Sequence, residues 1–247
     1  MPKVVTIQEL KEREGRIIET ACELIGHFGF AGVTMDKVVA EVPYSKGSVY
    51  KHFGSIEELL LAITNSGSYH LIELMEKAYD FEGNSREKCL ARTFAYFLYS
   101  QLYPIHFFCE MEALTPSVRE KASKERLIEG VELLGKFSAT AQRFIRFGIE
   151  SGDLCNSQMN QLNQATVSTW AAEFGICSYA MALHRSNSGL PERQREALEQ
   201  QLFFHANAVL DGMNWLPLSA ERDYEKVWRQ FEKFYFRDEM DRLMGSV

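Results

Sequence analysis

The sequence has 247 residues, of which 46% are hydrophobic, and this is enough material for one large or two modest globular domains. No apolar run approaches the ~18 residues that cross a bilayer. The N-terminus turns charged by Glu9 without an apolar signal core, so we expect a cytoplasmic location. The five cysteines are scattered and form no Cys-x-x-Cys pair, which favours buried free thiols over the alternative of a redox switch.

The net charge of −7 is unevenly distributed along the chain. Residues 1–54 carry seven basic and seven acidic side chains, which leaves 20 of the 27 basic and 27 of the 34 acidic side chains to the remainder. The N-terminal segment is therefore neutral and the remainder is acidic. An acidic remainder discourages nonspecific contact with a polyanion such as DNA.

The first predicted element is an amphipathic helix followed by Gly29, which is placed to end it. Its apolar residues recur at i, i+1, i+4, i+7, i+8 and i+11 and are Ile17, Ile18, Ala21, Leu24, Ile25 and Phe28.

Two short helices joined by a tight turn are predicted next, over residues 34–53. Thr34 is suited to cap the first helix, Pro43 stops it near Val42, and Ser45 is suited to cap the second, which runs to about His52. Such a pair predicts a helix-turn-helix, whose second helix enters the major groove of DNA. The residues that we expect at the DNA supply positive charge, hydroxyls or close backbone approach, and they are Thr34, Tyr44, Ser45, Lys46, Gly47, Ser48, Tyr50, Lys51 and His52. The alternative is that these residues merely solvate a short surface helix.

The order and spacing of these residues resemble the N-terminal domain of the TetR family of transcriptional regulators. The matching residues are Ile17–Ala21, Leu24–Ile25, Gly29–Phe30, Thr34 and Ser45–Phe53, followed by Glu57–Leu59. The resemblance covers about the first sixty residues. It implies a DNA-binding head over residues 1–54, an effector-binding and dimerisation body over residues 55–247, and a homodimer that binds a double-stranded DNA operator. We expect a repressor that a small, largely apolar effector releases from its operator.

Three positions depart from the family pattern. Pro43 stands where the family usually has Gly, Val39 replaces a smaller Ala, and Ile56 replaces a basic residue. Because Pro fixes φ near −65°, the turn must take a different path. The rival interpretation is a binding module of the same fold that acts through a protein partner and no longer reads DNA.

After Gly54 the sequence predicts helices without any strand-like alternation, and hence an all-α fold. The expected helices cover residues 55–80, 86–102, 104–113, 117–150, 157–186, 190–215 and 219–244. Breaks are expected at 83–85, Pro104, Pro116, 152–153, 186–189 and Pro217.

Aromatic residues are dense from residue 94 onward, and a well-filled helical core is the plain explanation for each of them. As a set they favour a site for an apolar ligand, in agreement with the pocket that the resemblance implies. The predicted effector-binding residues are Phe94, Phe97, Tyr103, His106, Phe107, Met111, Phe144, Trp170 and Phe174.

Catalysis is not expected. His106 and Glu110 lie one helical turn apart, but two ligands are too few for a metal site. There is no Gly-rich phosphate loop, no His-Glu-x-x-His and no nucleophile with a recognisable base, so we predict no enzyme activity, no cofactor and no metal.

Two stripes, each on one helix face, are candidates for a dimer interface, and intramolecular core is a fair alternative explanation for each of them. The stripes are Ala165, Ser168, Thr169, Ala172, Gly175 and Tyr179, and Leu198, Leu202, Ala206, Val209 and Met213. A final stripe predicts an extra C-terminal helix packed on the body, and it consists of Tyr224, Val227, Trp228, Phe231, Phe234 and Tyr235. The competing idea, a helix on a membrane surface, lacks the excess of Lys and Arg that it would need.

Overall fold

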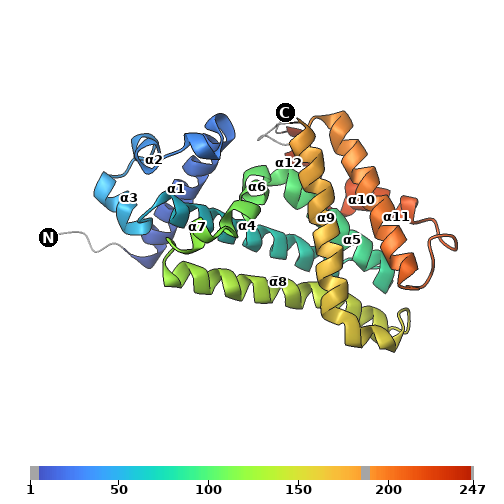
Figure 1. Ribbon diagram of the computed structural model, residues 1–247. Coiled ribbons are helices and arrows are strands. Elements are labelled where there is room, and N and C mark those ends of the chain that lie inside the picture. The colour runs from blue at the N-terminus through green and yellow to red at the C-terminus, as the bar shows by residue number, and fades with distance from the viewer. Residues whose placement is uncertain (1–5, 185–189, 246–247) are drawn as a thin grey trace. The chain divides into compact units, whose positions relative to one another are not determined.

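The computed structural model describes residues 6–184 and 190–245, and over these residues the protein is all-α (Figure 1). The predicted fold class is thereby confirmed, and the described residues contain no strand. None of the described helices is long and apolar enough to cross a membrane. The break expected at residues 186–189 lies outside the described residues.

The chain divides into two compact units. Of the described residues, those up to 67 and those at 105–132 form the head unit, and those at 68–104 and from 133 onward form the body unit. The boundary falls inside α4 (Ile56–Tyr79) and α8 (Lys124–Glu150), so each of these helices contributes to both units. The predicted division into functional domains after Gly54 stays a prediction.

The head unit is built on α1 (Ile7–Phe28), which crosses behind α2 (Met35–Glu41) and α3 (Lys46–His52) in Figure 1. Thr6 and Glu9 form a capping box at its start, and Gly29 ends it with a φ of +70°, a value that a residue without Cβ adopts easily. The predicted stripe is buried from Ile17 to Ile25, but Phe28 is 59% exposed, with the Lys37 ammonium 4.9 Å from its ring centroid.

The core of the head unit joins α1, α2 and α3 to the first half of α4 and to two short helices, α6 (Pro104–Ala113) and α7 (Pro116–Arg119). A short 3₁₀ helix, η1 (Phe30–Gly32), connects α1 to α2. The expected helix over 117–150 is divided into α7 and α8, and turns and a bend occupy residues 120–122. Because the helix is divided, Val118 of α7 packs into the head core, where it is 4% exposed.

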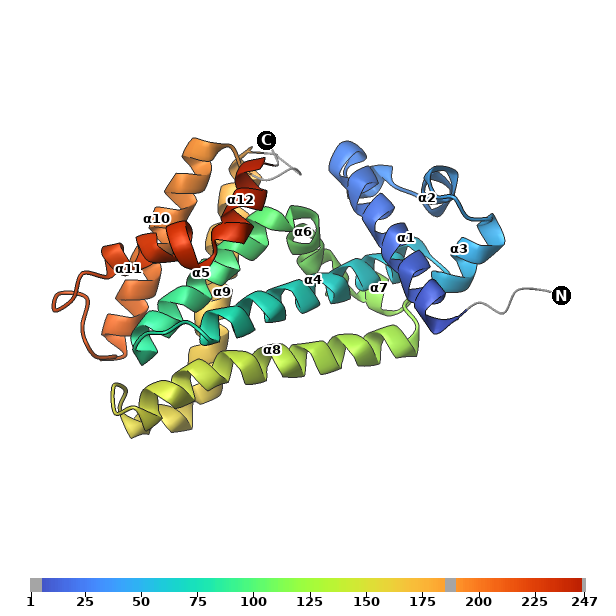
Figure 2. The same cartoon turned by 180° about the vertical axis from the view of Figure 1, so that it is seen from behind.

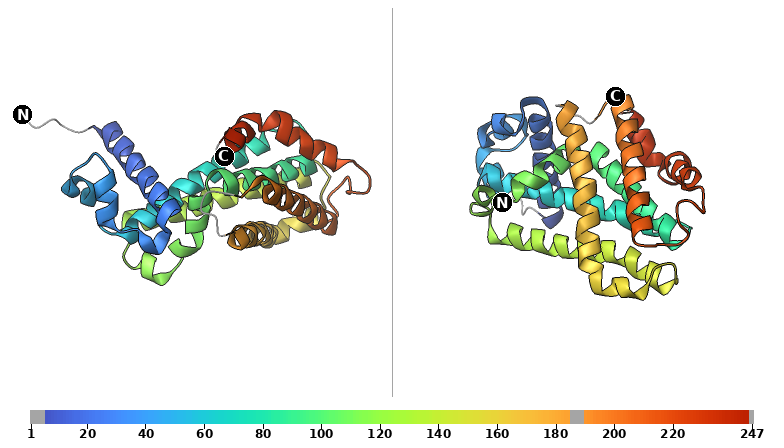
Figure 3. Two further views of the ribbon diagram at one scale, coloured as in Figure 1. Left: turned by 90° about the horizontal axis from the view of Figure 1, so that it is seen from above. Right: turned by 45° about the vertical axis from the view of Figure 1, so that its right-hand side comes forward.

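The body unit is centred on α5 (Ser85–Leu102), whose residues are buried along almost its whole length. The helices α9 (Leu162–His184) and α10 (Glu192–Gly212) lie side by side and antiparallel (Figures 1 and 3), and a 3₁₀ helix, η2 (Asn156–Gln161), precedes α9. The second predicted dimer stripe faces inward at Leu198, Leu202 and Ala206, which are at most 3% exposed, because α10 packs on α5. Intramolecular core is therefore the correct interpretation of those three residues.

The C-terminal segment packs on α5, as Figure 2 shows from behind, but it is not the single helix expected over 219–244. It consists of α11 (Tyr224–Gln230), a π-helical turn η3 (Phe231–Tyr235) and α12 (Arg237–Gly245). The wider π turn places Phe231 and Phe236 together in the core, both 0% exposed. Phe234, which the periodicity assigns to the buried stripe, is 75% exposed instead.

Candidate functional site

The helix α3, which the sequence predicts to be the DNA-recognition helix, is fixed from both ends. The Ser45 hydroxyl accepts a hydrogen bond from the Ser48 amide at 3.3 Å, which caps the helix, while Val49 and Phe53 are fully buried in the head core. Exposed on the opposite side are Lys46, Gly47, Tyr50 and Lys51, all four of them predicted DNA contacts. The helix therefore presents two ammonium groups and a phenol to the surroundings.

The turn before α3 accommodates Pro43 without any residue in the left-handed backbone conformation. Val42 is extended, with φ −98° and ψ 148°, which is the conformation that a residue before proline prefers. The two other departures from the family pattern have a structural role, because Val39 and Ile56 are partly buried against the head core. Ile56 thus contributes packing at a position where a basic residue would offer charge.

The other predicted contacts surround α3. Thr34 caps α2 by accepting from the Lys37 amide at 3.4 Å, and Tyr44 is half-buried with the Arg13 guanidinium 5.1 Å from its ring centroid. His52 is also half-buried, and its Nδ1 lies 3.7 Å from a carboxylate oxygen of Glu14. All nine predicted residues therefore belong to α3, the turn before it or the start of α2.

One charge on this surface is already paired. Lys46 Nζ donates to Asp36 Oδ1 at 2.7 Å, and this bond raises the pKa of Lys46. Both side chains are well exposed, so water and salt weaken the attraction. Lys51, whose side chain is exposed, has no such acidic partner among the described residues.

Comparison with known proteins agrees with this arrangement. The family model described as bacterial regulatory proteins of the tetR family matches residues 17–63, which hold the helix-turn-helix. YerO of Bacillus subtilis, described as an uncharacterized HTH-type transcriptional regulator, is 42% identical over 53 residues, covering 22% of this chain and 18% of YerO. The chain thus matches less than a fifth of that relative's length.

Solved structures extend the likeness over most of the chain at the level of the fold. A tetR-family regulatory protein from Rhodococcus RHA1 has a TM-score of 0.58 at 17% identity, with 80% of this chain and 97% of the other covered. The regulator PfmR from Thermus thermophilus has a TM-score of 0.59 at 20% identity, covering 79% and 97%.

Residues 17–63 of this chain thus match the N-terminal domain of the TetR family, and the chain shares the fold of solved TetR-family structures. The matched relatives bear the names of transcriptional regulators, in line with the expectation that the chain is not an enzyme.

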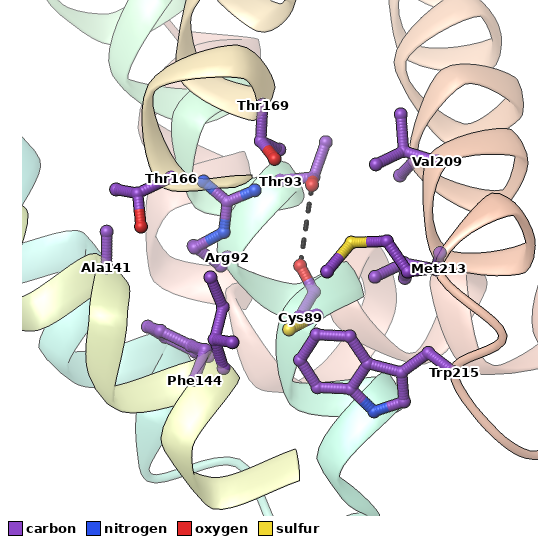
Figure 4. A pocket seen from close by; sticks show the side chains of 13 residues that line it. Cys89, Arg92, Thr93, Ala141, Phe144, Thr166, Thr169, Val209, Met213 and Trp215 are labelled. Carbon is purple, nitrogen blue, oxygen red and sulfur yellow. Dashed lines mark hydrogen bonds between the residues drawn. The ribbon is translucent and has the colours of Figure 1, made fainter. Parts of the chain in front are cut away.

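The body unit contains a small cavity between α5, α8, α9 and α10 (Figure 4). Its lining residues are Cys89, Arg92, Thr93, Ala141, Phe144, Ile145, Thr166, Thr169, Ala206, Val209, Leu210, Met213 and Trp215. Its volume of about 30 Å³ holds a few water molecules, whereas pockets for drug-sized ligands measure ~300–1,000 Å³. A ligand of that size would therefore bind only after lining side chains move, and the unbranched Met213 is suited to such movement.

A buried ion pair forms one wall of the cavity. Arg92 of α5 donates from Nη1 and Nη2 to the two carboxylate oxygens of Glu173 on α9, at 3.1 and 2.9 Å, and the Thr93 hydroxyl donates to the same carboxylate at 2.8 Å. The side chains of Arg92 and Glu173 are 10% and 0% exposed. A fork-to-fork pair of this kind orients both side chains and links the two helices.

Most of the predicted effector-binding residues lie elsewhere. Phe144 lines the cavity, and the other eight do not. Phe94 and Phe97 are fully buried in the core, Tyr103 stacks on His70, and Trp170 packs beside Phe174. The last three residues, His106, Phe107 and Met111, belong to the head unit.

The buried pair of Arg92 and Glu173 was not predicted, although the sequence contains a signal for it. Arg92 is the one charged residue between positions 89 and 109, and Glu173 is the one between 154 and 184, with His taken as neutral. Two lone, opposite charges on otherwise uncharged helices favour a buried pair, because an unpaired charge is costly to bury.

Proposed function

We propose that this chain is a DNA-binding transcriptional regulator, acting as a repressor that a small, largely apolar effector releases from a double-stranded operator. The observation that carries the proposal is the recognition helix. Its apolar residues Val49 and Phe53 anchor it, and Lys46, Tyr50 and Lys51 remain exposed for phosphates and base edges. Such a protein acts where the DNA is, in the cytoplasm.

A homodimer suits this function, because two recognition helices must reach successive major grooves about 34–36 Å apart. The exposed face of α9 supports the dimer. It carries no charged residue, yet Val167, Tyr179 and Leu183 are 59–66% exposed, and Phe204 on the adjacent α10 is 74% exposed. Gly175, in the same face, has open space around the position of a Cβ, so a partner helix could approach closely there. We therefore propose α9 and α10 as the dimer interface.

Release from DNA would follow from a population shift. An effector that binds the cavity better in one conformation favours that conformation in proportion to its differential affinity. Because the cavity is lined by four helices of the body unit, a bound ligand would push these helices apart. The conformation that holds ligand would then be the one with lower affinity for the operator.

A mobility-shift assay with the DNA that flanks its own gene tests the function. Lys51→Ala should weaken binding to all sequences alike and lower the salt slope by about one unit, because one phosphate contact is lost. Lys136→Ala, which removes an exposed lysine from α8 outside the head unit, is the matched control and should leave binding unchanged. If neither the wild type nor any variant shifts this DNA, the rival protein-partner function gains support.

A further inference from the structure

The ion pair of Arg92 and Glu173 presents only one of its partners to the cavity. Arg92 is among the lining residues and Glu173 is not. A guanidinium has five N–H groups, and two of those of Arg92 donate to Glu173. Among the described residues no other acceptor engages Arg92, so donors remain for a ligand that enters the cavity.

Two threonines of α9 complement these donors. The hydroxyl of Thr166 donates to the Leu162 carbonyl at 2.8 Å, and that of Thr169 donates to the Ala165 carbonyl at 2.7 Å. With their hydrogens used in this way, the two hydroxyl oxygens are left as acceptors. In Figure 4 both threonines lie near the Arg92 guanidinium, and Met213 and Trp215 lie on the other side of the cavity. The cavity thus has a polar end with both donors and acceptors and an apolar end.

The net charge of the cavity lining decides whether a charged or a neutral ligand fits. Glu173 already neutralises Arg92, and burial raises the pKa of Cys89 to about 12, so the thiol stays uncharged. A carboxylate ligand would add a negative charge that nothing in the lining balances, and burying an unpaired charge is far more costly than burying a hydrogen-bonded neutral group. A neutral carbonyl group accepts from Arg92 without that cost.

We infer that the effector is a neutral amphiphile whose carbonyl oxygen accepts a hydrogen bond from Arg92 and whose apolar chain packs against Phe144, Met213 and Trp215, and that the site discriminates against the corresponding free acid. This inference rests on the proposed ligand-binding function of the body.

The test compares hexanamide with hexanoate, which share the chain length and differ in charge, by calorimetry at pH 7.5. The wild type should bind hexanamide at least about tenfold more tightly, which corresponds to about 1.4 kcal/mol. In Glu173→Gln the order should reverse, because Arg92 then lacks a counter-charge and pairs with the carboxylate. Glu150→Gln, which removes an exposed carboxylate of α8, is the control and should keep the wild-type order.

A second measurement needs no change at Glu173. On the wild type, the apparent affinity for hexanoate should rise about tenfold for each pH unit between 7.5 and 5.5, because only the protonated acid enters and its fraction grows in that proportion. The affinity for hexanamide should stay flat. Thr169→Phe, which fills the cavity, should abolish binding of both probes.

The outcomes separate two failures. Equal affinity for amide and acid, or hexanoate binding that ignores pH, would overturn the inference and leave the ligand-binding function standing. If neither these probes nor 1-hexanol binds, or if Thr169→Phe binds them all unchanged, the cavity is not a ligand site, and the effector part of the proposed function falls with the inference.

Discussion

Arg126 of α8 donates from Nη2 to Glu14 Oε1 of α1 at 2.5 Å, and its guanidinium lies 5.4 Å from the ring centroid of Phe53, the residue that ends the recognition helix. The other oxygen of Glu14 is the one that lies near His52. One carboxylate therefore connects the start of α8 to the end of α3 within the head unit. The arrangement makes Arg126 a candidate for controlling how firmly the recognition helix is held.

Arg126→Ala should loosen α3. The variant loses a charge-assisted hydrogen bond between side chains that are 18% and 29% exposed, and such bonds contribute about 1.5–3 kcal/mol. Hydrogen exchange should show faster exchange of the amides of Val49 and Phe53. Arg229→Ala removes a well-exposed pair with Glu225 one turn away and serves as the control, and it should leave the exchange of the α3 amides unchanged. Unchanged exchange in α3 of Arg126→Ala would contradict the assignment.

Two glycines of α8 should respond in opposite ways to alanine. A Cβ at Gly148 would lie 2.3 Å from Cζ2 of Trp215, so Gly148→Ala forces the indole to move and should destabilise the protein by about 1–3 kcal/mol. Gly135 has nothing within 4 Å, and Gly135→Ala should stabilise the helix by about 0.5–1 kcal/mol. Urea denaturation measures both. A neutral Gly148→Ala would show that Trp215 is held loosely and that the cavity wall opens easily.

The C-terminal segment offers a matched pair of phenylalanines. Phe231 is 0% exposed and meets Phe94 and Trp228 ring to ring, so Phe231→Ala should cost about 3–5 kcal/mol. Phe234, on the same π turn, is 75% exposed, and Phe234→Ala should stay within about 0.5 kcal/mol. Thermal and urea unfolding measure the difference. Similar stabilities for the two variants would mean that this segment contributes little to the body core.

The head was predictable from the sequence because its signals are local. Gly29, Thr34, Pro43 and Ser45 each act within a few residues of their own position, and each one starts or ends a helix where expected. The buried face of α1 likewise follows from its own periodicity. Even here Phe28 is misassigned, since periodicity does not reveal that the core ends one turn earlier.

The body cavity and the C-terminal segment depend on contacts between distant parts of the chain. Arg92 and Glu173 are 81 positions apart, and Phe94 meets a ring as far along as Phe236. The dense aromatic residues suggest a pocket, but Phe94 and Phe97 are buried in the core of the body unit. They are buried because the C-terminal helices cover α5. A π turn cannot be read from an i, i+3, i+4 pattern, which is why the periodicity assigns Phe234 to the wrong face.

The final prediction concerns pH. His70 of α4 stacks on Tyr103 with ring centroids 4.1 Å apart, and Arg242 of α12 donates to the Tyr103 hydroxyl at 3.2 Å. Burial is the main cause that lowers the pKa of His70 below its ordinary value of 6.5; nearby Glu73 opposes the shift, and Arg242 adds to it. The unfolded chain therefore takes up a proton near pH 6.5 before the folded protein does. Stability is fully present above pH 6.5 and declines as the pH falls below it.

Replacing His70 by Phe keeps an aromatic ring against Tyr103 and removes the titration. The drop in melting temperature between pH 7.5 and 5.5 should therefore be smaller in His70→Phe than in the wild type. His27→Gln removes an exposed histidine of α1 and should reproduce the wild-type drop. If His70→Phe loses as much stability on acidification as the wild type does, the acid sensitivity arises from other groups and the stacked His70 does not contribute to it.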